Sequence, residues 1–161
     1  MFRSSFKNLT TFSYAVFHEM IHLLQKTWGW PDITWGYYIR RAEIKDETQN
    51  KIITVSARDY DNLEEFMAYA YQSWFCMHIV PHINYHLNQL PINFGQAVKS
   101  VTLAEFQAGI KKNQAFEMGR SVYRCKKYYS KLPEALKKLA FALIDPKVKE
   151  YLTANGIYEP Q

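Results

Sequence analysis

The segment Phe17–Gln25 reads FHEMIHLLQ and sets two histidines four residues apart among apolar side chains. That spacing places His18 and His22 one turn apart on the same face of a helix, and Glu19 directly follows the first histidine. Because the flanking residues leave almost no polar face, we expect a helix over about residues 10–26 that is buried on most sides. Burying two imidazoles and a carboxylate without partners is unfavourable, and a shared metal ion removes that penalty. The segment therefore predicts a metal-binding helix.

The motif formed by His18, Glu19 and His22 has the form HExxH. On a helix, this motif brings two imidazoles to one zinc ion and leaves the glutamate beside the metal as a general base. The alternative is a surface helix whose histidines share this spacing by coincidence. The apolar surroundings favour the metal site.

The third ligand does not come from the extended metzincin pattern. That pattern needs a glycine three residues and a histidine six residues after His22, and Gln25 and Trp28 occupy those positions. A glutamate from a later helix is the other common solution. The segment DNLEEFMAYAYQ, residues 61–72, offers two adjacent glutamates.

Glu65 is the favoured ligand of the two, with Glu64 as the alternative. Asp61 and Glu64 have the spacing of a capping box, which would occupy Glu64 at the start of a helix. Glu65 is free to point elsewhere. Ala68 lies one turn along on the same side and is small enough to let this helix approach the histidine helix closely.

The remaining pattern predicts an α+β chain that is predominantly helical. A β-hairpin is expected at about 33–44 and 51–57, around the polar segment KDETQN, and a helix at about 62–79 that Pro81 ends. Further helices form a C-terminal bundle. They are expected at 103–112, at 114–130, after Pro133, and from Asp145–Pro146 to Asn155–Gly156. The length suits a single domain over residues 1–161.

Composition limits the partners and the location. The net charge is +5, and most of the excess lies beyond residue 110 at helical spacing, which favours a solvated helix face over a nucleic-acid surface. Cys76 and Cys125 are expected to be reduced thiols. We find no signal peptide and no membrane-spanning run, so a cytoplasmic protein is expected, with release as an effector as the alternative.

The two motifs together resemble the gluzincin class of zincin metallopeptidases. HExxH in residues 17–22 is followed, after a hairpin, by a helical N-x-x-E-F-x-A-x-A pattern in residues 62–71. This combination is most similar to the catalytic domain of anthrax lethal factor and its relatives, including the Pro-Pro endopeptidases. The resemblance implies a zincin-like fold, a Zn²⁺ cofactor held by His18, His22 and Glu65, and Glu19 as general base. It also implies a peptide or protein substrate, which a hairpin edge could align by strand addition.

This chain differs from the family pattern at the residue that would stabilise the oxyanion of the transition state. The family carries a tyrosine shortly before the glutamate ligand. Here Arg58 stands at that spacing and the nearest tyrosine is Tyr60, so both are candidates. Zincins of this type also place a β-sheet before the HExxH helix. Only about ten residues precede that helix here, so we expect either the C-terminal part of a longer protein or a reduced fold.

A zinc-dependent endopeptidase is the function expected from these residues, and two alternatives stay open. One is a regulatory protease similar to those that cleave phage-type repressors, which also combine HExxH with a helical E-x-x-A segment. The other is a binding module that zinc holds together and that has no catalytic activity. Composition does not identify the substrate.

Overall fold

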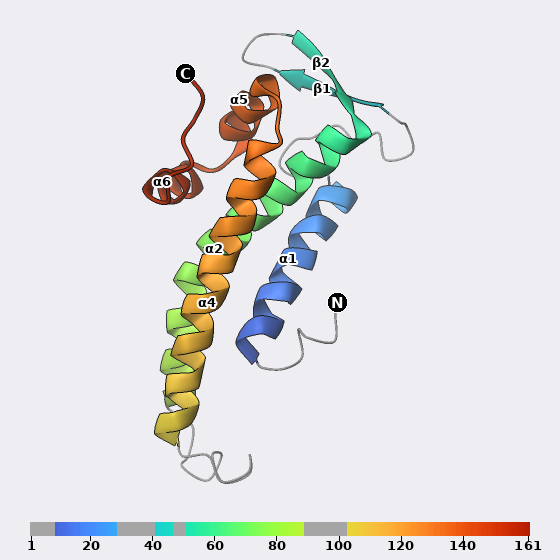
Figure 1. The fold of residues 1–161 in the computed structure, drawn as a ribbon. Helices are drawn as coiled ribbons and strands as arrows, with labels where there is room; N and C mark the ends of the chain where they lie inside the picture. Colours follow the sequence, from blue (N-terminus) through green and yellow to red (C-terminus); the bar gives the residue numbers. More distant parts are fainter. Residues whose placement is uncertain (1–8, 29–40, 47–50, 89–102) are drawn as a thin grey trace.

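The computed structural model describes residues 9–28, 41–46, 51–88 and 103–161, and within these ranges the chain is predominantly helical, as predicted (Figure 1). The elements, in chain order, are α1 (Leu9–Trp28), β1 (Arg41–Asp46), β2 (Lys51–Ser56), α2 (Ala57–Asn88), α4 (Leu103–Ser130), α5 (Glu134–Leu143) and α6 (Pro146–Ala154). None of the described helices has the length and apolar character needed to cross a membrane.

Helix α2 is the centre of the arrangement. It contacts α1, α4, α5, α6 and both strands, and α1 also contacts α4. Figure 1 shows α1 and α4 each running antiparallel to α2, with the hairpin near the start of α2 and α5 and α6 beside the end of α4. Side chains that project from α2 can therefore meet side chains from both long neighbours.

The core explains why α2 is central. Its apolar residues Leu63, Phe66 and Met67 are fully buried and join the buried residues of α5 and α6 in one hydrophobic cluster. Burial of this apolar surface is the main favourable contribution to folding. The members from the C-terminal part of the chain are Leu132, Leu136, Leu139, Ala140, Phe141, Ile144, Val148, Tyr151, Leu152 and Ile157.

The hairpin was predicted in part. Strands β1 and β2 pair antiparallel from Arg41 opposite Ser56 to Asp46 opposite Lys51. The first strand continues to Asp46, so the expected turn at residues 45–50 was placed too early. Residues 33–40 of the predicted first strand lie outside the described residues.

The predicted start of α2 at Asp61 was wrong. The helix begins at Ala57, one turn earlier. The hydroxyl of Ser56 accepts a hydrogen bond from the Asp59 backbone N–H at 3.2 Å and donates one to the Asp59 carboxylate at 2.8 Å. Ser56 therefore caps the helix and Asp61 lies inside it, because a serine with an acidic residue three positions later satisfies the end of the helix first.

Two predicted helix ends are also wrong. Helix α2 continues through Pro81 to Asn88, since a proline removes one backbone hydrogen bond and can bend a helix without ending it. Helix α4 is continuous from Leu103 to Ser130, where two helices meeting near residue 113 were expected. Asn113 is only a weak helix former, and no proline interrupts the segment. Four helices, not five, therefore follow the hairpin in the described part of the chain.

The end of the chain follows the prediction closely. The Asp145 carboxylate accepts a hydrogen bond from the Lys147 backbone N–H at 2.8 Å, and Pro146 is the first residue of α6. Such an acidic cap followed by proline is a favoured helix start. Gly156 has φ of 80° just past the helix end, a backbone conformation that glycine adopts without strain.

Candidate metal centre

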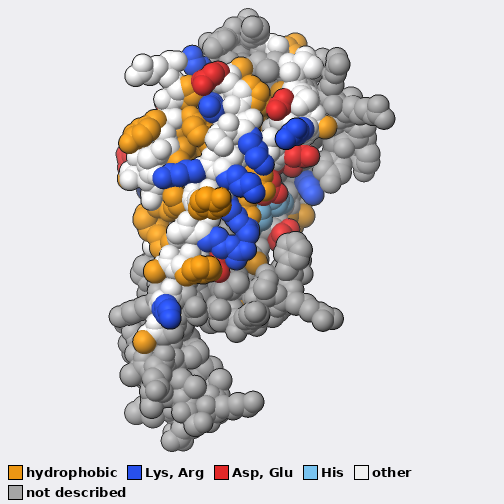
Figure 2. Space-filling model, viewed as in Figure 1, with side chains coloured by type: hydrophobic (Ala, Val, Ile, Leu, Met, Phe, Trp, Pro, Cys, Tyr) orange, Lys and Arg blue, Asp and Glu red, His pale blue; other side chains and the backbone are white. Residues whose placement is uncertain are grey.

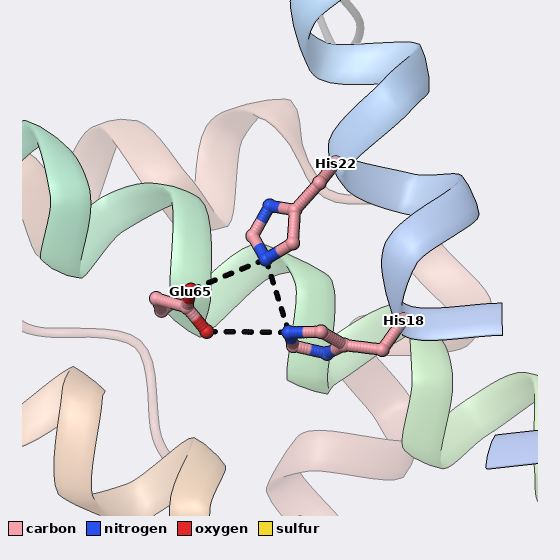
Figure 3. Close-up of side chains that lie close together, drawn as sticks. All are labelled: His18, His22 and Glu65. Atoms are coloured by element: carbon pink, nitrogen blue, oxygen red, sulfur yellow. Dashed lines mark hydrogen bonds and ion pairs between the residues drawn. The ribbon is translucent and has the colours of Figure 1, made fainter. Parts of the chain in front are cut away.

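The three predicted metal ligands come together between α1 and α2. His18 and His22 project from one face of α1, and Glu65 projects towards them from α2 (Figure 3). The Nε2 atoms of the two histidines are 3.0 Å apart. His18 Nε2 lies 3.3 Å from Glu65 Oε2, and His22 Nε2 lies 3.2 Å from Glu65 Oε1. One ligand atom from each residue lies within 4.8 Å of the others, so this group could hold a metal ion.

His18 belongs to the buried face of α1, and the half-buried His22 lies at its edge. Tyr14, His18, Ile21 and Gln25 are buried and recur at helical intervals, so they form one face. The rest of the helix is less enclosed than predicted, because Met20 on the other side exposes 53% of its surface. The expectation of a helix buried on most sides was therefore wrong. A single buried face suffices to carry the two imidazoles.

Two buried glutamines orient the imidazole rings. Gln72 Oε1 lies 2.9 Å from His18 Nδ1, and Gln25 Oε1 lies 2.8 Å from His22 Nδ1. An amide oxygen can only accept, so each Nδ1 carries the hydrogen. Each Nε2 is then left with its lone pair directed at the other histidine and at Glu65. This is the tautomer that metal-binding histidines adopt when a partner holds the far nitrogen.

A second layer of hydrogen bonds holds the glutamines. Gln25 Nε2 donates to the backbone carbonyl of Glu64 at 3.1 Å, which fixes the orientation of an amide that is fully buried. Gln72 Nε2 lies 3.3 Å from Ser121 Oγ on α4. The histidines of α1 are therefore linked to both long neighbouring helices. Sequence reasoning missed both glutamines, although Gln25 occurs at i+3 from His22 inside an otherwise apolar segment.

Glu65 is held as a carboxylate. Burial alone would raise its pKa, but hydrogen bonds and charge interactions with His18 and His22 outweigh burial and lower the pKa of Glu65 to about 2. Burial also favours the neutral form of His22, yet its hydrogen bond to Glu65 leaves the pKa of His22 raised. An anionic carboxylate facing two imidazoles is the charge distribution that suits a divalent cation.

Glu64 has a different environment from its neighbour. It is 8% exposed, and burial, only partly offset by the charges of His22 and Lys26, raises the pKa of Glu64 to about 7. The geometry brings Glu65, not Glu64, to the histidines, as the sequence favoured. The reason given for that choice was wrong, because Glu64 does not belong to the helix cap.

The predicted catalytic residues lie outside this set of contacts. Glu19 follows His18 on α1 and is exposed. Arg58 is exposed on the first turn of α2, two turns before Glu65 on the same side of the helix, roughly 10 Å along its axis. Tyr60 is buried in the core, where burial and the charge of Glu64 raise its pKa. The described contacts of the three candidate ligands include none of these residues.

A tyrosine that sequence reasoning missed lies against the centre. The ring of Tyr69 has its centroid 4.3 Å from that of His18. Its hydroxyl accepts a hydrogen bond of 2.8 Å from Arg124 Nη1 on α4. Tyr69 follows Glu65 by one helical turn, so the spacing that placed Ala68 on this side could also have found it.

Comparison with protein-family models, with curated proteins and with solved structures finds no significant match to this chain.

Proposed function

We propose that His18, His22 and Glu65 bind Zn²⁺ and that the protein is a zinc-dependent endopeptidase of the gluzincin type. The observation that carries this proposal is the convergence of two Nε2 atoms and a carboxylate from two helices, with His22 and Glu65 43 positions apart in sequence. The carboxylate comes from the second motif, as the resemblance to gluzincins implies. The zincin-like fold is part of the same proposal.

The dimensions of the centre fit zinc. Zn²⁺ binds imidazole nitrogen and carboxylate oxygen at about 2.0–2.2 Å in a tetrahedron, in which neighbouring ligand atoms lie roughly 3.3 Å apart. Here the two Nε2 atoms are 3.0 Å apart, and each lies 3.2–3.3 Å from a different oxygen of the Glu65 carboxylate. With one ligand atom taken from each residue, all three lie within 4.8 Å of one another, so binding zinc requires only a small turn of the Glu65 carboxylate. Three protein ligands would leave the fourth position of the tetrahedron for water or substrate, which is the arrangement of a catalytic site.

The protonation pattern also supports a cation. Both Nδ1 atoms face amide oxygens, so both Nε2 lone pairs and the Glu65 carboxylate face one another. Three acceptors cannot satisfy each other, and a buried acceptor without a donor is costly. A cation between them, either a metal ion or a shared proton, supplies the missing partner. A zinc ion can bind all three acceptors at once.

The general base of this proposal is Glu19. When bound, zinc supplies a Lewis acid and an open coordination position. The Glu19 carboxylate takes a proton from the attacking water as the bond from oxygen to the peptide carbon forms. It then delivers that proton to the amine nitrogen as the carbon–nitrogen bond breaks. Exposure of Glu19 is compatible with this role, since the carboxylate must reach both water and substrate.

Arg58 is the better of the two predicted oxyanion donors. Its guanidinium is exposed and lies on the Glu65 side of α2, whereas the hydroxyl of Tyr60 lies in the core beside Glu64. A positively charged donor stabilises the negative charge that develops on the carbonyl oxygen during attack. Strand addition of the substrate to an edge of the hairpin stays a prediction.

The test compares zinc content with cleavage. Wild type and Glu19→Gln are loaded with zinc, freed of excess metal, and assayed against a quenched-fluorescence peptide library. We expect equal zinc content, with cleavage by wild type and a loss of at least about 100-fold in Glu19→Gln, because general-base catalysis is worth roughly 10²–10⁴-fold.

Glu150→Gln serves as the matched control, since Glu150 is also an exposed helical glutamate. It should cleave like wild type. Undiminished cleavage by Glu19→Gln would rule out this mechanism. Bound zinc without chelator-sensitive cleavage by wild type would point to the non-catalytic binding module.

A further inference from the structure

Four basic residues recur at intervals of four, three and four, three of them on α4 and the fourth directly after its last residue, and we call Arg120, Arg124, Lys127 and Lys131 the cationic stripe. The intervals keep Arg120, Arg124 and Lys127 on one side of the helix over roughly 10 Å of its length. Arg124 is half-buried and the other three are exposed. Figure 2 shows Lys and Arg side chains gathered on the face that α4 presents, with histidine surface at the edge of the cluster.

Two tyrosines connect the cationic stripe to the candidate metal centre. The ring of Tyr69 lies against His18, and it stacks on the ring of Tyr128 with centroids 5.7 Å apart. Arg124 donates to the Tyr69 hydroxyl at 2.8 Å and lies over the Tyr69 ring at 5.6 Å. The cationic stripe is therefore separated from a candidate zinc ligand by a single side chain.

The lysines of the stripe are oriented by an uncharged partner. Lys127 Nζ lies 5.8 Å and Lys131 Nζ 5.2 Å from the centroid of the Tyr128 ring. An aromatic face attracts an ammonium and restricts its motion without cancelling its charge. Two exposed positive charges are thus held two aromatic rings away from His18, in positions where an anion can reach them.

The charge balance differs along the stripe. Arg120 lies 3.9 Å from the carboxylate of buried Glu117, which partly compensates its charge. For Lys127 and Lys131, no carboxylate among the described residues lies within salt-bridge distance. Net positive charge therefore increases along the stripe past Arg124, which is the member that contacts Tyr69.

We propose that the cationic stripe binds acidic side chains of the polypeptide whose scissile bond lies at His18, His22 and Glu65. The preferred substrate is then a segment rich in Asp and Glu. This inference rests on the proposed function. Alternate residues of an extended peptide lie about 7 Å apart on one side, close to the roughly 4.5–6 Å rise between successive members of the stripe on α4. The stripe would also concentrate acidic segments near the centre by long-range attraction.

Neighbouring lysines give a matched pair of variants for the cleavage test. Lys127 belongs to the stripe, whereas Lys126 lies about 100° around the helix, with its ammonium beside Gly156. The zinc-loaded full chain is assayed with quenched peptides that carry Asp and Glu around the scissile bond and with counterparts that carry Asn and Gln. Wild type should prefer the acidic peptides.

The two charge reversals should differ. Lys127→Glu should lower the preference for acidic over neutral peptides by about 3- to 10-fold, because it reverses a charge at the substrate. Lys126→Glu should keep the wild-type preference. Cleavage without acidic preference, or an equal loss in both variants, would overturn the inference.

A binding measurement separates this inference from the proposed function. Fluorescein-labelled hexaglutamate and fluorescein-labelled oligothymidylate are titrated with zinc-loaded Glu19→Gln and followed by anisotropy. Hexaglutamate should bind more tightly, and its binding should weaken with added salt and in the double variant with Lys127→Glu. If no peptide is cleaved but this pattern holds, the proposed function fails and the acidic-peptide surface stands. Absent binding of hexaglutamate, or tighter binding of the oligonucleotide, would overturn the surface.

Discussion

The Nε2 atoms of His18 and His22 lie 3.0 Å apart, each within 3.3 Å of a Glu65 oxygen, while both Nδ1 atoms face glutamine oxygens. This relationship leaves acceptors facing acceptors unless a cation lies among them. A bound metal should therefore stabilise the folded state, since the unfolded chain has no such assembled site.

Removing the metal should lower thermal stability. A ligand at 100 times its Kd stabilises a protein by about 2.7 kcal/mol, which corresponds to a rise in Tm of roughly 5–10 °C for a chain of this size. We expect EDTA to lower the Tm by that amount and added Zn²⁺ to restore it, followed by circular dichroism. An unchanged Tm in both conditions would contradict a metal site that is coupled to folding.

The glutamines should position the histidines. Gln25→Leu and Gln72→Leu each remove the acceptor of one Nδ1–H, and loss of such outer partners typically weakens metal binding by about 10- to 100-fold. A merely structural effect would lower the Tm equally with zinc and with EDTA. We expect instead that the zinc-dependent increment in Tm shrinks in both variants. Zinc titration with a competing chelator measures the affinity directly.

Phe66 should be a main contributor to stability. It is fully buried in the core, and its ring lies 5.1 Å from that of Tyr129 on α4. Phe66→Ala should destabilise the fold by about 3–5 kcal/mol through lost burial and a cavity. Phe116→Ala on the same helix as Tyr129 is the control, because Phe116 is 66% exposed and should change stability by less than about 0.5 kcal/mol. Urea unfolding measures both, and equal effects would contradict this packing.

Both cysteines should be unreactive in the folded protein. Cys76 and Cys125 are buried and unpaired, and burial raises the pKa of both thiols, that of Cys76 to about 12. The reactive thiolate is therefore scarce at pH 8. We expect slow labelling by a thiol reagent in buffer and rapid labelling in guanidinium chloride. Fast labelling of the native protein would show that these helices open more readily than their burial indicates.

The fold could be predicted where local chemistry decides it. The cap at Asp145 with Pro146, and the stop at Gly156, act within a few residues, so the sequence contains the whole signal. The start of α2 was missed because the sequence offers two capping boxes whose first residues are only five positions apart. Ser56 with Asp59 precedes Asp61 with Glu64, and only the folded chain shows which is used.

Helix continuity was harder to predict. Pro81 and Asn113 both weaken a helix locally, and each was taken as a boundary although the helix continues through it. The free energy of one lost hydrogen bond or one poor helix former is small compared with that of a long helix. The packing of α2 against α4 stabilises both helices, and it depends on residues far apart in sequence, so it cannot be predicted from the composition of either segment alone.

The sequence identified the three candidate ligands, but it did not identify most of the residues that surround them. HExxH fixes the spacing of His18 and His22. Glu65 was favoured over Glu64 partly for a capping role of Glu64 that the structure does not contain, and only the packed helices show that Glu65 is on the side of α2 that faces α1. The partners Gln72, Tyr69 and Arg124 meet the centre only through the packing of α1 and α4 against α2. Tyr69 could have been found from its place one turn after Glu65, whereas Gln72 and Arg124 have no spacing rule that would identify them in advance.

Adjacent glutamates provide the most direct test of the central claim. Zinc is titrated into metal-free wild type, Glu65→Gln and Glu64→Gln, with a competing chelator as indicator and circular dichroism to verify folding. The account predicts a single high-affinity zinc per chain in wild type and in Glu64→Gln. It predicts that Glu65→Gln weakens zinc binding by more than the roughly 10- to 100-fold that is typical when a residue next to a ligand, and not a ligand itself, is replaced. A folded wild type that binds no zinc, or a Glu65→Gln variant that binds it as tightly as wild type, would contradict the account.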